Sequence, residues 1–396
     1  MADSQPANWP FPLDDPYPTY HAMRQEGPVH WAPELDAFLV LSYDLAFSIL
    51  RGPEWSVDPR NSPALASSMS AGPAPDLWTK TLLFMDPPGH TRLRGLVNRS
   101  FSPKAVEALR PRVASVVEAA LGDLAGRSQA ELLDQLGYPV PLAVISELLD
   151  VGVEGAATLR EETPALTAIL EMDPDPKTIE SSLAAAMRVM MLLVPLVAER
   201  RAQPGIDLLS QLAAACDDAR QLEVDELMVT CMLLLAAGHE TTANLVGNGT
   251  LALLRHPDQL ELLRRRPELG RSAVEELLRF DSPVQLTARI ALEDVQLAGH
   301  TVRKGEQALV LLGAANRDPR QFQDPDCLDI TRSGARHLAF GSGAHFCLGA
   351  SLARLEAEET LTRLVASFPE MRLRDSSPNW RPSTVFRRLA SLPVWL

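Results

Sequence analysis

Apolar residues recur with the spacing of amphipathic helices through most of the middle of the chain. The pattern runs from residue 102 to about residue 280, and this spacing favours helix over strand. It opens on Ser102-Pro103, a favourable N-cap and first-turn pair. Breaks between helices are expected at Gly137, at Gly152-Val153, between Met172 and Pro176, and at Gln203-Pro204-Gly205. This region therefore predicts a bundle of several helices.

One predicted helix in this region is unusually long. The stretch from Val224 to about Arg255 contains no proline, and as a single helix it would measure roughly 45–50 Å at a rise of 1.5 Å per residue. Its middle is apolar, so we expect it to pass through the centre of the protein.

Strand-like segments are found on both sides of the helical region. Near the N-terminus, a short helix over Tyr17–Gln25 precedes alternating segments at residues 29–31 and 37–41. After residue 283, three β-like segments and two turns are expected. The strands are Gln285–Ala291, Val295–Leu297 and Ala308–Leu312, and the turns are Ala298-Gly299 and Lys304-Gly305.

Three further segments complete the expected organisation. Residues 52–78 are rich in Pro, Ser, Gly and Ala without a clear period, which predicts a long loop. An amphipathic helix is expected from about Leu348 to Phe368, and a short hairpin or coil from Thr384 to Trp395. Together the patterns predict a mainly α fold with a small β part, organised as a single domain over residues 1–396.

Composition and charge argue against several classes of protein. The 396 residues carry a net charge of −14, which argues against general binding to nucleic acid or to an anionic membrane. The most apolar run, Leu227–Ala237, has eleven residues, whereas a bilayer span needs about 20. The four cysteines show no CxxC or metal-knuckle spacing, and Cys216 and Cys231 lie in apolar helical sequence that favours buried free thiols. We therefore expect a cytoplasmic protein without a membrane anchor or disulfides.

The segment Phe340-Gly341-Ser342-Gly343-Ala344-His345-Phe346-Cys347-Leu348-Gly349 carries the clearest candidate for chemistry. Its glycines allow a tight backbone close to a flat ligand. Cys347 stands where the next helix is expected to begin, and the positive end and free N–H groups of a helix lower a thiol pKa. The resulting thiolate would suit a soft metal. The alternative is a reactive or merely structural cysteine at a helix cap.

Two other patterns fall in the helical region. Glu276 and Arg279, three residues apart, share one helix face just before the β-like segments. The segment Ala237-Gly238-His239-Glu240-Thr241-Thr242 places glycine and polar residues in the apolar middle of the long helix, and such local inconsistencies tend to mark function. The alternative is a glycine that permits close helix packing and a threonine that bonds back to its own helix.

The cysteine segment resembles the haem-binding loop of cytochromes P450, because Phe340, Gly343, Cys347 and Gly349 match every fixed position of Phe-x-x-Gly-x-x-x-Cys-x-Gly. The resemblance covers nearly the whole chain in order and spacing, and it is to the soluble type found in actinobacterial secondary metabolism. It implies a triangular, α-rich prism whose long central helix crosses the haem. It also implies heme b as cofactor, with the Cys347 thiolate as axial ligand of the iron.

The same resemblance implies roles for the middle of the long helix. Ala237 and Gly238 would lie at the distal face of the haem, where Gly238 leaves room for O2 in a locally distorted helix. Glu240 and Thr241 would form the acid–alcohol pair that delivers protons to bound dioxygen.

Charged residues elsewhere would shape and hold the haem site by the same resemblance. Glu276 and Arg279 would form a buried structural network with a third arginine, either Arg332 or Arg336. The haem propionates would be bound by His90, Arg94, Arg289 and His345.

A mostly apolar substrate pocket is implied above the distal face. Its expected lining is Leu83, Phe84, Leu234, Ala237, Gln285, Leu286, Val385 and Phe386. Ordinary core packing is the alternative for each of these residues.

The implied reaction is insertion of one oxygen atom from O2 into a C–H bond of a small, largely apolar substrate, by hydroxylation or epoxidation. Oxidative coupling that closes a C–C, C–O or C–N bond without net oxygen insertion is the alternative that the motifs leave open. A third possibility is a non-enzymatic haem protein, a sensor or electron carrier. The Glu240–Thr241 pair and the apolar pocket argue against it.

Electrons are expected from a separate ferredoxin and its reductase, since no flavin or ferredoxin domain is fused to the chain. An acidic ferredoxin would dock on the Cys347 side and be steered by basic side chains despite the overall charge. Nothing in the sequence indicates more than a monomer. The expected basic patch consists of Arg92, Arg99, Lys104, Arg110, Arg112 and Arg354.

Overall fold

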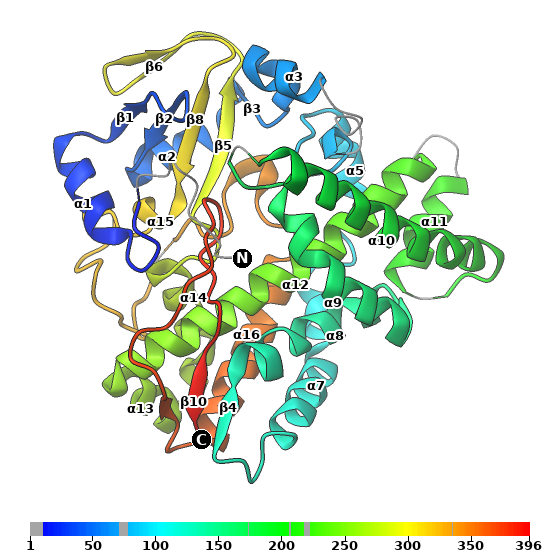
Figure 1. The fold of residues 1–396 in the computed structure, drawn as a ribbon, viewed down its shortest axis with the longest axis vertical. Helices are drawn as coiled ribbons and strands as arrows, with labels where there is room; N and C mark the ends of the chain where they lie inside the picture. The colour runs from blue at the N-terminus through cyan, green and yellow to red at the C-terminus, as the bar shows by residue number, and fades with distance from the viewer. Residues whose placement is uncertain (1–10, 71–77, 173, 206, 218–221, 335) are drawn as a thin grey trace.

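Helices make up most of the molecule and surround one long helix that runs through its centre (Figure 1). The computed structural model describes residues 11–70, 78–172, 174–205, 207–217, 222–334 and 336–396. Its α-helices are α1 (Tyr17–Glu26), α2 (Tyr43–Ile49), α3 (Pro63–Ser70), α5 (Gly89–Val97), α6 (Pro103–Glu107), α7 (Arg110–Gly122), α8 (Pro139–Leu148), α9 (Gly152–Ala168), α10 (Pro176–Ala202), α11 (Leu208–Asp217), α12 (Val224–Arg255), α13 (Pro257–Arg265), α14 (Gly270–Phe280), α15 (Leu312–Ala315) and α16 (Ala350–Ser367). Shorter turns are the 3-10 helices η1 (Pro59–Asn61), η3 (Pro267–Leu269) and η4 (Gly343–His345), and the π-helical η2 (Leu133–Gly137).

The strands form small sheets, and the largest lies at the end of the molecule that holds α1 and α2 (Figure 1). The strands are β1 (Val29–Ala32), β2 (Ala37–Val40), β3 (Trp55–Ser56), β4 (Gln129–Glu131), β5 (Leu286–Ala291), β6 (Val295–Leu297), β7 (His300–Val302), β8 (Gln307–Leu311), β9 (Arg372–Leu373) and β10 (Pro393–Trp395). The largest sheet has the order β1-β2-β8-β5-β3, in which β2 and β8 are parallel and the other pairs antiparallel. The order β4-β10-β9 forms a second sheet, and β6 pairs with β7.

α12 is the element around which the other helices are arranged. Glu223 and Glu226 form a capping box at its start. It continues for 32 residues, a length of about 48 Å at 1.5 Å per residue. It packs against α8, α9, α10, α14 and α16, and most of its side chains are buried. The long central helix and the mainly α fold with a small β part are therefore confirmed.

A buried ion network joins α14 to the segment before the cysteine loop. The fully buried Arg279 donates to both carboxylate oxygens of Glu276, at 2.8 and 2.7 Å. Arg332 donates to the same two oxygens at 3.2 and 3.1 Å. Arg336 instead uses its backbone carbonyl, which accepts a hydrogen bond from the Tyr43 hydroxyl. The open choice between the two arginines is therefore resolved in favour of Arg332.

Two sequence predictions were wrong in detail. Residues 52–78 are not one loop, because β3, η1 and α3 occupy much of this stretch; residues 71–77 lie outside the described part. Pro63 at the first turn of α3 favours a helix start, a local signal within the Pro-rich composition. β4 interrupts the region expected to be helical because it pairs with β10, which lies near the C-terminus, and local periodicity cannot show such a pairing. Organisation as a single domain stays a prediction.

α10 differs from the other helices by its exposed apolar residues. By length and composition it is the one helix among the described residues that could cross a bilayer, and 33% of its apolar stretch is buried. Met187, Met191 and Val194 are exposed. Other faces of the helix pack against α9, α11 and α12, so α10 is also part of the helical bundle. The apolar run Leu227–Ala237, considered in the sequence, lies in α12 instead.

The buried network predicts a difference between two arginines that stand four residues apart. Arg332→Ala should lower the free energy of unfolding by about 1.5–3 kcal/mol, because it removes charged hydrogen bonds from the buried Glu276. Arg336→Ala should change it by less than about 0.5 kcal/mol, because that side chain is exposed. Denaturant unfolding of both variants checks this, and equal losses would contradict the assignment.

Candidate active site

The backbone of the cysteine loop depends on glycine at one position above all. Gly343 has a φ of +73°, and a Cβ atom there would lie 2.5 Å from the carbonyl oxygen of Leu50. Both facts exclude other side chains without backbone movement. The loop closes where the Cys347 N–H donates to the carbonyl of Phe340 at 2.9 Å. α16 then begins at Ala350, so the cysteine lies just before a helix start, as predicted.

The Cys347 thiol is accessible, but the protein around it still changes its pKa. Its side chain is accessible to a water-sized molecule, yet burial by the surrounding protein is the largest influence on its pKa and raises it. The N–H groups of Gly349 and Ala350 and the charges of Arg94 and Arg354 oppose this rise. The predicted lowering of the thiol pKa is therefore present but is outweighed by burial.

Four basic side chains gather beside this loop. The ring centroids of His90 and His345 are 4.1 Å apart. Burial, together with the charges of His90, Arg289 and Arg94, lowers the pKa of His345 to about 3. Burial also lowers the pKa of Arg289 to about 10, and the carboxylate of Asp86 partly opposes this. Within the described residues, His90 Nε2 is buried without a hydrogen-bond partner. The structure thus brings the four predicted residues together, and such a cluster suits a carboxylate-bearing ligand.

One face of α12 is only partly covered by protein. Residues 226–253 are all described, and the positions among them that are not buried are Leu233, Ala237, Gly238 and Thr241. At 100° per residue these positions share one face of the helix. The Thr241 hydroxyl donates to the carbonyl of Ala237 at 2.8 Å. Thr241 therefore bonds back to its own helix, as the alternative interpretation allowed, but it also lies on the partly covered face.

Gly238 contributes packing to this part of the helix. A Cβ atom at this position would approach Ile145 of α8 to 3.3 Å. α12 is assigned as continuous α-helix from Val224 to Arg255, so the expected local distortion is not seen. The exposed position of the pair is Ala237. Close helix packing, the alternative raised for this glycine, is therefore what the structure shows.

Glu240 lies behind the partly covered face, in a buried polar cluster. Its side chain is 2% exposed, and its Oε1 lies 3.5 Å from Nη1 of Arg388. His239 is also buried, with its ring centroid 5.5 Å from that of Tyr138. Burial lowers the pKa of His239 to about 4, which keeps its ring neutral at neutral pH. The sequence analysis missed Arg388, because no periodic pattern marks the C-terminal coil in which it stands.

The predicted pocket residues divide into accessible and buried positions. Leu83 is 39% exposed, and Phe84 and Val385 are half-buried. Leu234 and Phe386 are buried. The accessible positions could meet a substrate, whereas Leu234 and Phe386 first of all fill the core.

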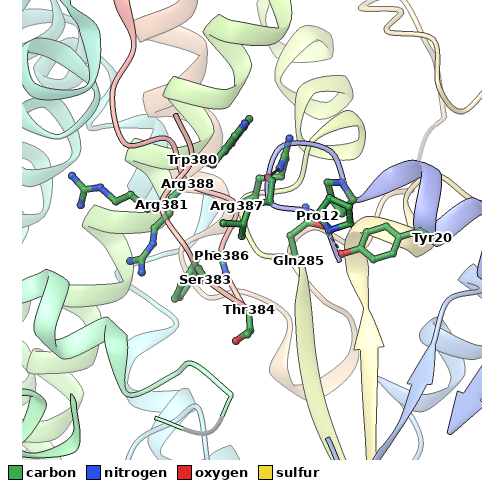
Figure 2. Close-up of a pocket in the computed structure, with 12 residues that line it drawn as sticks. Pro12, Tyr20, Gln285, Trp380, Arg381, Ser383, Thr384, Phe386, Arg387 and Arg388 are labelled. Carbon is green, nitrogen blue, oxygen red and sulfur yellow. Dashed lines mark hydrogen bonds between the residues drawn. The ribbon is translucent and has the colours of Figure 1, made fainter. Parts of the chain in front are cut away.

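Gln285 and Leu286 lie on the side of the sheet that faces α1. The Gln285 amide accepts from the Tyr20 hydroxyl and donates to the Tyr17 hydroxyl and the Ser282 carbonyl. Leu286 packs in a core cluster with both tyrosines. Gln285 also lines a small pocket of about 30 Å³ between the N-terminal segment and residues 380–388 (Figure 2). The core-packing alternative describes both residues; contact with substrate stays a prediction.

Comparison with known proteins gives the family. Residues 267–385 match the family model described as Cytochrome P450. Cytochrome P450 monooxygenase PikC of Streptomyces venezuelae is 42% identical over 390 residues, which cover 96% of this chain and 91% of the relative. The chain belongs to the cytochrome P450 family. It is an oxidoreductase, a P450 monooxygenase of the bacterial type.

Solved P450 structures resemble the whole chain. P450BioI in complex with hexadec-9Z-enoic acid ligated acyl carrier protein has a TM-score of 0.90 at 36% identity, covering 97% of this chain and 99% of that one. The P450 enzyme CxnD for C–S bond formation in chuangxinmycin biosynthesis has a TM-score of 0.89 at 35% identity, covering 100% and 97%. The predicted P450 fold is confirmed.

P450 enzymes carry a haem-thiolate cofactor, and the residues of this chain fit such a group. The side chain of Cys347 is exposed. The buried Nε2 of His90, which has no hydrogen-bond partner among the described residues, lies among basic side chains suited to carboxylates. A Cβ atom at Gly349 would meet no protein atom within 4 Å, so there is space beside the loop. The partly covered face of α12 adds another accessible surface.

The predicted basic patch is largely neutralised by carboxylates. Arg92 pairs with Glu226, Arg112 with Glu147 and Arg354 with Glu275, while Arg110 contacts Glu107, Glu358 and Glu359. Arg99 and Lys104 are exposed. The patch therefore carries less free positive charge than its sequence indicated, because helix neighbours that are distant in sequence supply acids.

Two glycines of the cysteine loop should respond differently to alanine. Gly343→Ala should destabilise the protein by about 1–3 kcal/mol or more, because its left-handed backbone and the Leu50 carbonyl both oppose a side chain. Gly349→Ala should leave the stability of haem-free protein unchanged, since its φ of −81° suits alanine, but should reduce haem retention. Denaturant unfolding and Soret absorbance per protein measure the two effects. Full haem retention in Gly349→Ala would show that the space beside it is not part of the haem site.

Proposed function

We propose that this P450 binds heme b through Cys347 and inserts one oxygen atom from O2 into a C–H bond of a small, largely apolar substrate, by hydroxylation or epoxidation. The observation that carries the proposal is the partly covered face of the otherwise buried α12, which bears Ala237 and Thr241 next to the buried Glu240. The thiolate-ligated haem supplies the activation of O2 when bound.

The residues around the cofactor would have separate tasks. His90, Arg94, Arg289 and His345 would bind the two propionates, which would satisfy the orphaned nitrogen of His90. Ala237, with its small side chain on the partly covered face, would leave room for O2 and substrate. Accessible Leu83 and Phe84 would contact an apolar substrate.

Proton delivery would fall to Glu240 and Thr241. The Thr241 hydroxyl is accessible, and its bond to the Ala237 carbonyl orients the oxygen lone pairs away from the helix axis. Glu240 lies one residue earlier and is buried, so bulk water has little direct access to its carboxyl group. A carboxyl group and a hydroxyl placed in series are suited to general acid catalysis.

Oxidative coupling is a second candidate reaction. The structural likeness to CxnD, described as forming a C–S bond, favours it, because the same site would serve both reactions. Product mass separates them, since oxygen insertion adds one oxygen atom and coupling removes two hydrogen atoms.

The proposal also includes partners and location. Electrons would come from a ferredoxin and its reductase, and O2 and a small molecule would be the substrates. We place the protein in the cytoplasm as a monomer that binds neither nucleic acid nor membrane, in line with its net charge of −14.

The axial ligand can be tested by absorption of the dithionite-reduced, CO-bound protein. Wild type should show the strongly red-shifted Soret band of thiolate-ligated haem. Cys347→His should bind haem but show the band of imidazole-ligated haem, because only the axial atom changes. An imidazole-type band in fresh wild type would overturn the assignment of Cys347.

The proton-delivery role predicts a specific loss in Thr241→Ala. With a substrate identified by its spin-state shift, product formation should fall by about 100-fold, while electron consumption continues and appears as hydrogen peroxide. Thr250→Ala is the matched control, because Thr250 makes the same bond to the carbonyl four residues earlier but is buried. Equal peroxide yields from the two variants would refute the role of Thr241.

A further inference from the structure

Arg388 stands between two carboxylates that belong to distant parts of the chain. Its Nη1 lies 3.5 Å from Glu240 Oε1 in α12, and its Nη2 lies 3.5 Å from Glu171 Oε1 in the connection between α9 and α10. The three side chains are 12%, 2% and 16% exposed, respectively. Arg388 therefore links the buried acid to a second acid nearer the surface.

Glu171 is itself held firmly. Its carboxylate accepts hydrogen bonds from the Ser383 hydroxyl and from both the N–H and the hydroxyl of Thr384, the last two at 2.6 and 2.8 Å. The Met172 N–H donates to the Thr384 hydroxyl at 2.9 Å. The α9–α10 connection is thereby tied to the C-terminal segment that also carries Arg388, so the outer end of the link is fixed.

The contact between Arg388 and Glu240, at 3.5 Å, is looser than a direct charged hydrogen bond. Both ion-pair separations exceed the roughly 2.7–2.9 Å of a direct charged hydrogen bond. Within the described residues, Glu240 Oε1 and Arg388 Nε are buried without a hydrogen-bond partner. Ser383, Thr384 and Arg388 also line the pocket of about 30 Å³ in Figure 2, which has room for about one water molecule.

The other titratable side chains near Glu240, Tyr138 and His239, do not change their charge near pH 7. Burial and the charge of Glu240 raise the pKa of Tyr138 to about 12, and His239 has its pKa lowered to about 4 by burial, so both are neutral near pH 7. Arg381 acts on the same cluster through Tyr138, but no carboxylate pairs with its side chain in the described part of the chain. Arg388 is therefore the cation in contact with the acid.

We propose that Arg388, anchored by Glu171, is a positioning residue that fixes the orientation of the Glu240 carboxylate. The inference rests on the proposed proton delivery by Glu240 and Thr241. An arginine side chain does not release its proton in proteins, so Arg388 acts by charge and hydrogen-bond geometry, and protons reach Glu240 by another group or water. In this way the α9–α10 connection controls the acid through a single guanidinium group.

The test uses the infrared C–O stretching band of the reduced, CO-bound holoenzyme, which responds to polar groups beside the bound gas. In wild type the band should be single and narrow. In Arg388→Met it should shift or broaden, because the Glu240 carboxylate loses its charged partner and is no longer held in one orientation. Arg388→Lys should restore the wild-type band, and the double variant Arg388→Met/Glu240→Gln should show the same band as Glu240→Gln alone.

Arg381→Met is the matched control, since Arg381 lines the same pocket without a carboxylate partner, and it should behave as wild type. An Arg388→Met band that matches wild type, or an equal shift or broadening in Arg381→Met, would overturn this inference alone. Loss of the red-shifted Soret band in wild type would overturn the proposed function as well. Circular dichroism melting shows whether Arg388→Met folds; if it does not, Arg388→Gln takes its place in the same comparison.

Discussion

The burial of α12 is the constraint on which the rest of this fold depends. A helix of 32 residues crosses the protein, and the other helices, α8, α9, α10, α14 and α16 among them, pack around it. Protein interiors are close-packed, so a strip that is only partly covered at Leu233, Ala237 and Thr241 is costly unless another group covers it. In a P450 the cofactor and substrate can do so. The cofactor is then part of the core, and its binding contributes to stability by mass action.

The interior treats its charges in two different ways. Every N–H group of Arg279 has a hydrogen-bond acceptor, two of them oxygens of Glu276. Arg387 is likewise paired, with its Nε 2.6 Å from Oδ1 of Asp281. Such networks fix architecture and exclude ligands. Among the basic side chains beside the cysteine loop, Nε2 of the buried His90 has no hydrogen-bond partner in the described part of the chain, and burial lowers the pKa values of His345 and Arg289. The contrast separates structural charges from those that await an anionic partner.

Sequence reasoning succeeded where the signal is local. The length of α12 and the strands after residue 283 were predicted because periodicity reports on neighbouring positions, whereas the four basic residues were implied by the resemblance to the family. It failed where partners come from far away. β4 exists because β10 pairs with it, and the basic patch is neutralised by acids such as Glu359, which lies 249 residues from Arg110. Pro63 locally indicated the start of α3, but the Pro-, Ser-, Gly- and Ala-rich composition of residues 52–78 led to the prediction of a loop.

Arg388 belongs to this second class, and its geometry indicates why a buried arginine is kept there. An ion pair at 3.5 Å in the interior adds little net stability, because desolvation offsets the attraction. An apolar side chain of similar volume would fill the space as well. What it could not do is place a positive charge beside the carboxylate of Glu240. The position is therefore better explained by control of the acid than by stability, and Glu171 extends that control to the α9–α10 connection.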